Sequence, residues 1–197
     1  MPIIIKKDME FNLEKFGDAL GKELVCQCSE CGLEVTCRGD EPENGQMLLA
    51  SPDIDGHWNR LGGEYVADAM LQLKDWPSVA FAWAGYLGMA VAYGWDNDWQ
   101  FCSNMPYTSY YGKQGFDDMD DHVMQDILSI GLESGEASAV RNLFRRCADT
   151  VISMIRHENV EAQSIEAYNV FVLSCRTMYR VGAAVELKRL GYKFEKL

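Results

Sequence analysis

Residues 76–95, WPSVAFAWAGYLGMAVAYGW, contain no Asp, Glu, Lys, Arg or His, and they constrain the fold more than any other part of the chain. About 20 residues suffice to cross the hydrocarbon core of a bilayer, so a membrane span and a buried helix compete. The stretch is rich in Ala, Gly, Trp and Tyr, and Asp75, Asp96 and Asp98 flank it in place of Lys and Arg. We therefore predict no membrane insertion and a central apolar helix over residues 77–95, buried inside a helical bundle.

Small side chains recur at every fourth position of this predicted helix, at Ala80, Ala84, Gly88 and Ala92. Positions four apart lie on the same face of an α-helix. A ridge of small residues lets a second helix approach closely, so the pattern predicts a tight helix–helix contact. The same ridge would also suit a groove that admits a ligand.

In four further segments the apolar residues recur with the period of an α-helix, which predicts helices over 61–73, 117–132, 134–157 and 164–190. Ser134 is the expected N-cap of the third segment, and Gly191 follows the fourth, whose last turn contains Lys188 and Arg189. A chain of 197 residues can bury roughly 70% of its unfolded surface without disulfides or metal. We predict a mainly α, single-domain protein (1–197), a bundle of about five helices, with a small N-terminal lobe (1–50) on a helical body (51–197).

The N-terminal lobe contains four cysteines within ELVCQCSECGLEVTC, namely Cys26, Cys28, Cys31 and Cys37. The part CSECG has the C-x-x-C-G spacing of a zinc knuckle, so these thiols are candidate ligands for zinc. A second C-x-x-C pair is missing, and His57 would join the site only if a long loop folded back.

A β-hairpin explains the same residues without metal. Apolar and polar residues alternate over 24–28 and again over 33–37, and the residues between them suit a turn. Free cysteine behaves as a small buried hydrophobe, so we favour a core hairpin. A reactive thiol is a third alternative and would require a lowered thiol pKa.

The chain carries 30 acidic and 18 basic residues, a net charge of −12. An acidic surface repels nucleic acid and anionic membranes, so we expect neither as a partner. Residues 1–140 contain 24 acids and 8 bases, whereas residues 141–197 contain 6 acids and 10 bases. We expect these halves to pair internally, although the basic end could instead bind an acidic partner. The absence of an apolar leader near the N-terminus and the odd count of seven cysteines favour a cytoplasmic location.

Polar residues on the predicted helices are weak candidates for a catalytic site. Within 61–73, Glu64 and Asp68 share one face, and Val66, Ala69, Met70 and Leu73 lie on another. Asp118 and His122, four residues apart, form the best pair for binding a metal ion from one helix face. The simpler interpretation is that the Asp residues at a helix start and His157 at a helix end are solvated and interact favourably with the helix dipole.

Arg176 and Arg180, also four apart, could hold a carboxylate or phosphate ligand. Alternatively, they neutralise acids of the N-terminal half across a helix interface, with Asp96, Asp98 and Glu64 as candidates.

We find no phosphate-binding loop, G-x-S-x-G elbow or H-E-x-x-H motif. The aromatic-rich stretch 96–116 is predicted to be a loop, and long loops are often functional. The leading hypothesis is a non-catalytic interaction or assembly protein that uses its acidic face or residues 99–116 to bind a protein partner or a second copy. The alternative is a metal- or small-ligand-dependent enzyme with a polar site inside the bundle. Convergence of the polar candidates would favour the enzyme, and an apolar patch around Trp99 and residues 107–111 would favour the interaction protein.

Overall fold

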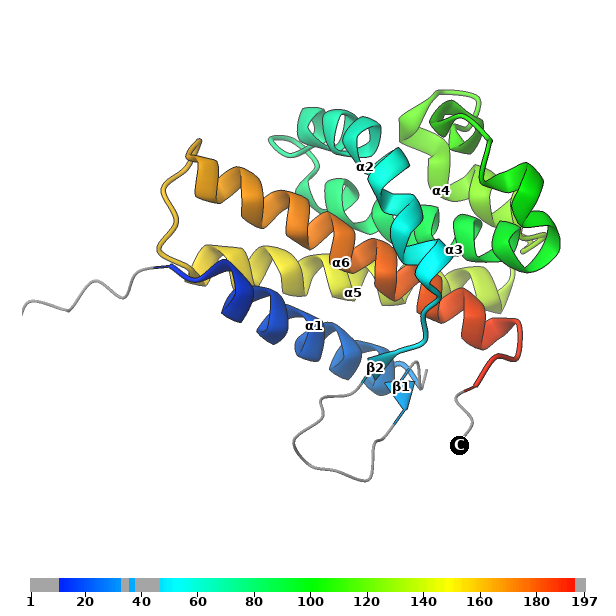
Figure 1. Cartoon of the computed structure of the whole chain (residues 1–197), viewed down its shortest axis with the longest axis horizontal. Helices are drawn as coiled ribbons and strands as arrows, with labels where there is room; N and C mark the ends of the chain where they lie inside the picture. The colour runs from blue at the N-terminus through cyan, green and yellow to red at the C-terminus, as the bar shows by residue number, and fades with distance from the viewer. Residues whose placement is uncertain (1–10, 33–35, 38–46, 194–197) are drawn as a thin grey trace, which may run out of the picture.

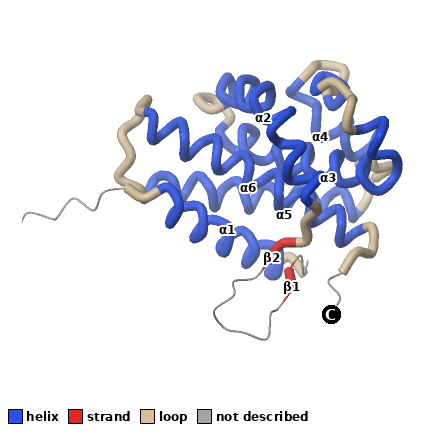
Figure 2. Tube along the Cα trace, in the orientation of Figure 1, coloured by secondary structure: helices blue, strands red, loops and turns tan. Residues whose placement is uncertain are grey.

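The computed structural model describes residues 11–32, 36–37 and 47–193, and this part of the chain is mainly helical (Figures 1 and 2). Its α-helices, in chain order, are α1 (Leu13–Glu30), α2 (Pro52–Gln72), α3 (Pro77–Cys102), α4 (Met119–His122), α5 (Gly135–His157) and α6 (Ile165–Arg189). Short 3-10 turns cover Tyr107–Tyr110 and Phe116–Asp118, and a π-helical turn at Val123–Ile127 follows α4. The prediction of a mainly α bundle is confirmed.

Helix starts follow the predicted capping chemistry. Ser134 accepts a hydrogen bond from the backbone N–H of Ala137 at 3.0 Å, and Ser164 does the same for Ala167 at 3.0 Å. α3 begins at Pro77, where a missing N–H costs nothing. α3 also continues beyond the predicted end at residue 95, with a kink at Asp98, whose backbone leaves the helical region (φ −156°, ψ 83°).

The predicted hairpin at 24–28 and 33–37 is wrong, because residues 24–28 lie inside α1. Asn12 caps this helix by accepting from the N–H of Lys15 at 2.9 Å. Phe16, Leu20, Leu24 and Cys28 then form a buried stripe with helical spacing. Only two-residue strands are described nearby: β1 (Thr36–Cys37) pairs antiparallel with β2 (Met47–Leu48).

The predicted separate lobe over residues 1–50 does not describe α1, which packs against α5 and α6 (Figure 1). Its buried residues belong to the same hydrophobic core as those of α2, α3, α5 and α6. The remainder of the predicted lobe, residues 1–10, 33–35 and 38–46, lies outside the described residues.

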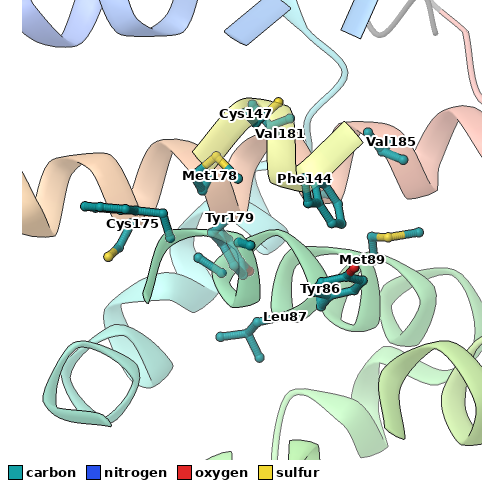
Figure 3. Close-up of a cluster of buried hydrophobic side chains, with 14 of the residues drawn as sticks. Tyr86, Leu87, Met89, Phe144, Cys147, Cys175, Met178, Tyr179, Val181 and Val185 are labelled. Atoms are coloured by element: carbon teal, nitrogen blue, oxygen red, sulfur yellow. The ribbon is translucent and has the colours of Figure 1, made fainter. Parts of the chain in front are cut away.

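The core centres on α3 and α6, which make the most extensive helix–helix contact. A Cβ at Gly88 would overlap the carbonyl oxygen of Tyr179 and lie 2.9 Å from the nitrogen of Ala183, so the two backbones touch. The predicted close approach along the small-residue ridge is therefore confirmed. Larger side chains fill the space around this contact, and Figure 3 shows Leu87, Met89, Phe144, Met178 and Tyr179 among them.

Within the described ranges, no helix combines the length and the hydropathy that a membrane span requires. Two buried tyrosines donate their hydroxyl protons to backbone carbonyl groups. Tyr65 donates to the carbonyl of Ala80 at 2.8 Å, and Tyr179 donates to the carbonyl of Ile54 at 2.8 Å. These bonds join α2 to both central helices.

Candidate functional site

Glu64 and Asp68 share the outward face of α2, one helical turn apart, as predicted from their spacing. Glu64 is exposed and Asp68 is half-buried. Asp68 Oδ2 accepts a hydrogen bond from the hydroxyl of Tyr111. The aromatic segment after α3 therefore folds back onto this acidic face. The hydrogen bond joins two residues that are 43 positions apart in the sequence.

Tyr107 lies beside this contact. Its ring packs edge-on against that of Tyr111, with centroids 5.3 Å apart, and the residue is only 2% exposed. Its hydroxyl is buried without a hydrogen-bond partner of normal geometry. Burial and the neighbouring charge of Asp68 raise the pKa of Tyr107. Burial, with the bond to Asp68, also raises the pKa of Tyr111 to about 12. Both phenols therefore stay protonated at neutral pH, and their hydroxyl groups lie against the carboxylate of Asp68.

His57, which the sequence offered only as a distant ligand for the cysteine site, is a second buried polar group. Its ring meets that of Trp99 edge-on at 5.0 Å, and Nε2 has no hydrogen-bond partner. Burial, together with the charge of Arg60, lowers the pKa of His57. Arg60 itself donates to the carbonyls of Ser103 and Asn104 and so holds the end of α3. His57 is thus a neutral packing residue at the α2–α3 contact.

His122 does not form the predicted pair with Asp118. Its Nδ1 lies 2.8 Å from Asp126, and its Nε2 donates to the carbonyl of Ser109 at 3.2 Å. Asp118 instead accepts from the backbone N–H of Gln114 at 2.9 Å. His122 therefore fastens the aromatic segment to the α4 region.

The other polar candidates lie apart. His157 is exposed at the last residue of α5. Arg176 and Arg180 are exposed on α6, and Arg180 pairs with Asp55 at 3.5 Å rather than with Asp96, Asp98 or Glu64. The described structure therefore brings Asp68 together with two tyrosines, but it does not gather the predicted Glu, Asp, His and Arg set in one place.

The cysteines of α1 point in different directions. Cys26 is exposed, Cys28 is fully buried and Cys31 is partly exposed, with Arg146 Nη1 at 3.7 Å from its sulfur. Cys28 faces Cys147 of α5, and the hydrogen bond between the two thiols, with burial, raises the pKa of Cys147. Among the described residues no three His, Cys, Asp or Glu side chains are placed to hold a metal ion. The side chain of Cys37 lies outside the described part of the chain.

Ion pairs join the acidic and basic halves of the sequence. The pairs Asp121–Arg141, Glu30–Arg146, Asp55–Arg180 and Glu136–Arg189 each link an acid of residues 1–140 to a base of residues 141–197. Internal pairing of the two halves, the favoured prediction, is therefore confirmed. The basic side chains in these pairs are already matched within the molecule.

An apolar patch around Trp99 and residues 107–111, which would have favoured the interaction protein, is not found, because Tyr107 and Tyr110 are buried. Exposed apolar side chains gather instead where α2 ends and the turn to α3 begins. We call this set the α2-end patch; it consists of Met70, Leu71, Leu73 and Trp76, exposed by 47%, 78%, 38% and 65%.

The four apolar residues assigned to one face of this helix differ in burial: Val66 and Ala69 are buried, whereas Met70 and Leu73 are exposed. A signal for the patch was present in the sequence. Leu71 lies three residues after Asp68 and seven after Glu64, so it shares the polar face of α2, where a leucine has no core to enter.

No family model matches the chain, and comparison with curated proteins and with solved structures likewise found no match.

Proposed function

We propose that this chain is a non-catalytic interaction protein and that the α2-end patch is its contact surface. The observation that carries the proposal is the exposure of four large apolar side chains within seven consecutive positions, 70–76. Single exposed apolar residues are ordinary, whereas a contiguous group marks a contact surface. Trp and Leu at the centre of such a group supply the buried area that anchors an interface.

The distribution of polar groups supports an interaction protein over an enzyme. General acid–base chemistry needs titratable groups within hydrogen-bond reach of one reacting position. Here His122 is engaged with Asp126 and Ser109, Arg180 with Asp55, and His157 lies at the end of α5. His122 and Arg180 thus serve local structural contacts, and His157 lies apart from them.

The charge of the molecule favours a basic partner. α2 itself carries four acids, Asp53, Asp55, Glu64 and Asp68, against one base, Arg60, and the whole chain has a net charge of −12. A second copy would bring like charge to the interface, since arginines of its basic half are paired with its own acids. The partner is therefore a protein segment with an apolar anchor and flanking Lys or Arg residues.

The test compares three purified proteins: wild type, the double variant Leu71→Ser/Trp76→Ser, and the control Phe101→Ser. Phe101 is 66% exposed, much like Trp76, but lies near the opposite end of α3. Proteins captured from an extract of the source cells are identified, purified and titrated against all three, at low and high salt. We expect a partner whose Kd rises more than about ten-fold with the double variant and is unchanged with Phe101→Ser.

Affinity for that partner should also fall as salt increases, because the flanking charges are exposed. Equal binding to the double variant and the wild type would overturn the assignment of the patch. Sedimentation of the wild type and the double variant measures whether the protein is a monomer or a dimer. A wild-type dimer that dissociates in the double variant would replace the basic partner with a second copy.

A further inference from the structure

Three cysteines lie where the end of α1 packs against α5 (Figure 1). Cys28 of α1 and Cys147 of α5 are both fully buried, and their thiols are hydrogen-bonded to each other. Cys31 directly follows the last residue of α1 and is partly exposed. A buried pair of thiols therefore lies next to a third thiol that solvent can reach.

Arg146 holds this end of α1 against α5. Its guanidinium donates to the carboxylate of Glu30 and lies 3.7 Å from the sulfur of Cys31. Glu30 and Cys31 are adjacent in the sequence. Arg146 and Cys147 are adjacent too, so these contacts place Cys31 at the level of Cys147 on α5. A partly exposed sulfur beside a guanidinium is the environment typical of reactive cysteines.

The buried pair is protected from direct oxidation. Neither thiol is in contact with solvent, and the hydrogen bond to Cys28, together with burial, raises the pKa of Cys147. Peroxides oxidise accessible cysteines in the thiolate form, so Cys31 is the point of entry for an oxidant. The sulfenic acid formed there condenses with a neighbouring thiol to give a disulfide.

We propose that hydrogen peroxide oxidises Cys31 and that Cys147 then closes a disulfide between α1 and α5. In the first step the sulfur of Cys31 is oxidised to a sulfenic acid, and the peroxide is reduced to water. In the second step the sulfur of Cys147 displaces the hydroxyl group from Cys31, and the S–S bond forms. The displaced hydroxide takes the proton of the Cys147 thiol and leaves as water. Two thiols and one peroxide thus give one disulfide and two waters.

The geometry of α1 selects Cys147 over Cys28 as the first partner of Cys31. Helical residues three apart have Cβ atoms about 5–6 Å apart, whereas a disulfide needs about 3.5–4.5 Å. The N–H of Cys31 donates to the carbonyl of Gln27 at 3.1 Å, which keeps the last turn of α1 closed. Cys28 already contacts Cys147, so its thiol can then displace Cys31 by exchange, which consumes no oxidant. The product is a disulfide from Cys147 to either α1 cysteine.

The experiment treats the native full-length protein with hydrogen peroxide, blocks the remaining thiols with an alkylating reagent and maps disulfides by mass spectrometry without reduction. Trypsin cuts after Arg146, which separates Cys147 from the cysteines of α1. We expect a disulfide-linked peptide pair that contains Cys147 and either Cys31 or Cys28. Because the new bond closes a long loop, the oxidised protein should also unfold at a Tm at least about 5 °C higher, and dithiothreitol should reverse this shift.

Variants identify the entry thiol. Cys31→Ser should slow formation of the cross-link to Cys147 at least about ten-fold, because it removes the accessible thiol beside Cys147. Two controls should form the cross-link at the wild-type rate: Cys26→Ser, which is exposed on α1, and Cys102→Ser, which is partly exposed like Cys31 but lies at the end of α3. None of the three substituted cysteines is buried, so these variants should keep the fold.

Equal rates of cross-linking in Cys31→Ser and the wild type would overturn Cys31 as the entry thiol. Oxidation of Cys31 to a sulfinic acid, or to a disulfide confined to residues 26–37, with Cys147 left as a free thiol, would overturn the link between α1 and α5. The site shares no residue with the α2-end patch, so neither result bears on the proposed function.

Discussion

The carbonyl oxygen of Gly85 on α3 occupies the position that a Cβ atom of Gly182 on α6 would take. This contact joins two backbones, so neither side can yield by rotating a side chain. It makes glycine at position 182 a requirement of packing.

We expect Gly182→Ala to lower the free energy of unfolding by about 3 kcal/mol or more, because the added methyl group must separate the two central helices. Gly63→Ala is the control, since nothing lies within 4 Å of a Cβ at that position on α2. This change should be neutral or stabilise by up to about 1 kcal/mol through helix propensity. Urea unfolding followed by circular dichroism measures both, and similar values for the two variants would contradict the packing argument.

Glu186 is fully buried on α6 and is held by Arg189, through Nε to Oε2 at 2.8 Å and Nη2 to Oε1 at 3.0 Å. Arg189→Met should lower stability by about 3 kcal/mol, because it leaves a buried carboxylate unpaired. Burial already raises the pKa of Glu186. The loss should therefore grow as pH rises and the carboxylate must ionise without its partner. Adding Glu186→Leu should recover most of the stability, and a double variant no better than Arg189→Met would refute this account.

Burial raises the pKa of Asp120 to about 6. A carboxyl with a pKa higher in the folded state than in the unfolded state binds its proton more tightly when folded. Stability from this group is therefore complete below about pH 4 and is lost as pH rises through 6. Asp120→Asn should gain about 1 to 2 kcal/mol on the wild type between pH 4 and pH 7.5, measured as the difference in unfolding free energy at each pH. A pH-independent difference would exclude ionisation of Asp120 as the cause.

Thiol reactivity should follow exposure. Among the cysteines whose side chains the structure describes, Cys26 is exposed and should react first with a thiol reagent, and Cys31 and Cys102 are partly exposed and should react more slowly. The buried Cys28, Cys147 and Cys175 should react only on unfolding. The pKa of Cys147 is raised by its hydrogen bond to Cys28 and by burial, and burial raises the pKa of Cys175, which further slows the reaction of these two thiols. Mass spectrometry of alkylated peptides at timed intervals gives the order. Rapid labelling of Cys28 would contradict its place in the core.

The central helix and its close partner could be predicted because their sequence signals are long and agree with one another. Residues 76–95 lack charge over several turns, and small residues repeat along one face, so burial and close packing were the consistent solution. The caps Ser134 and Ser164 likewise act locally, through a hydrogen bond three residues away. Signals of this kind do not depend on the rest of the fold.

The prediction of a hairpin at the cysteines was wrong because five alternating residues are too short a pattern to distinguish a strand from a helix. Extending the window back to Phe16 gives a repeat every fourth residue through Leu20, Leu24 and Cys28, which is helical. The contact of Asp68 with Tyr111 could not be predicted for a different reason. It depends on the path of the chain after α3, where the kink at Asp98 and the following turns direct the tyrosines onto α2. No local pattern encodes that path.

The position of α6 at the centre of the fold has a consequence for synthesis. α6 contacts α1, α2, α3 and α5, yet the ribosome makes it after all of them. Until residues 165–189 emerge, the glycine surface of α3 has no partner, and the earlier acidic segments lack the arginines that neutralise them. The nascent chain therefore completes its core only at the end of translation of these segments, and the growing polypeptide must be kept from aggregating until then.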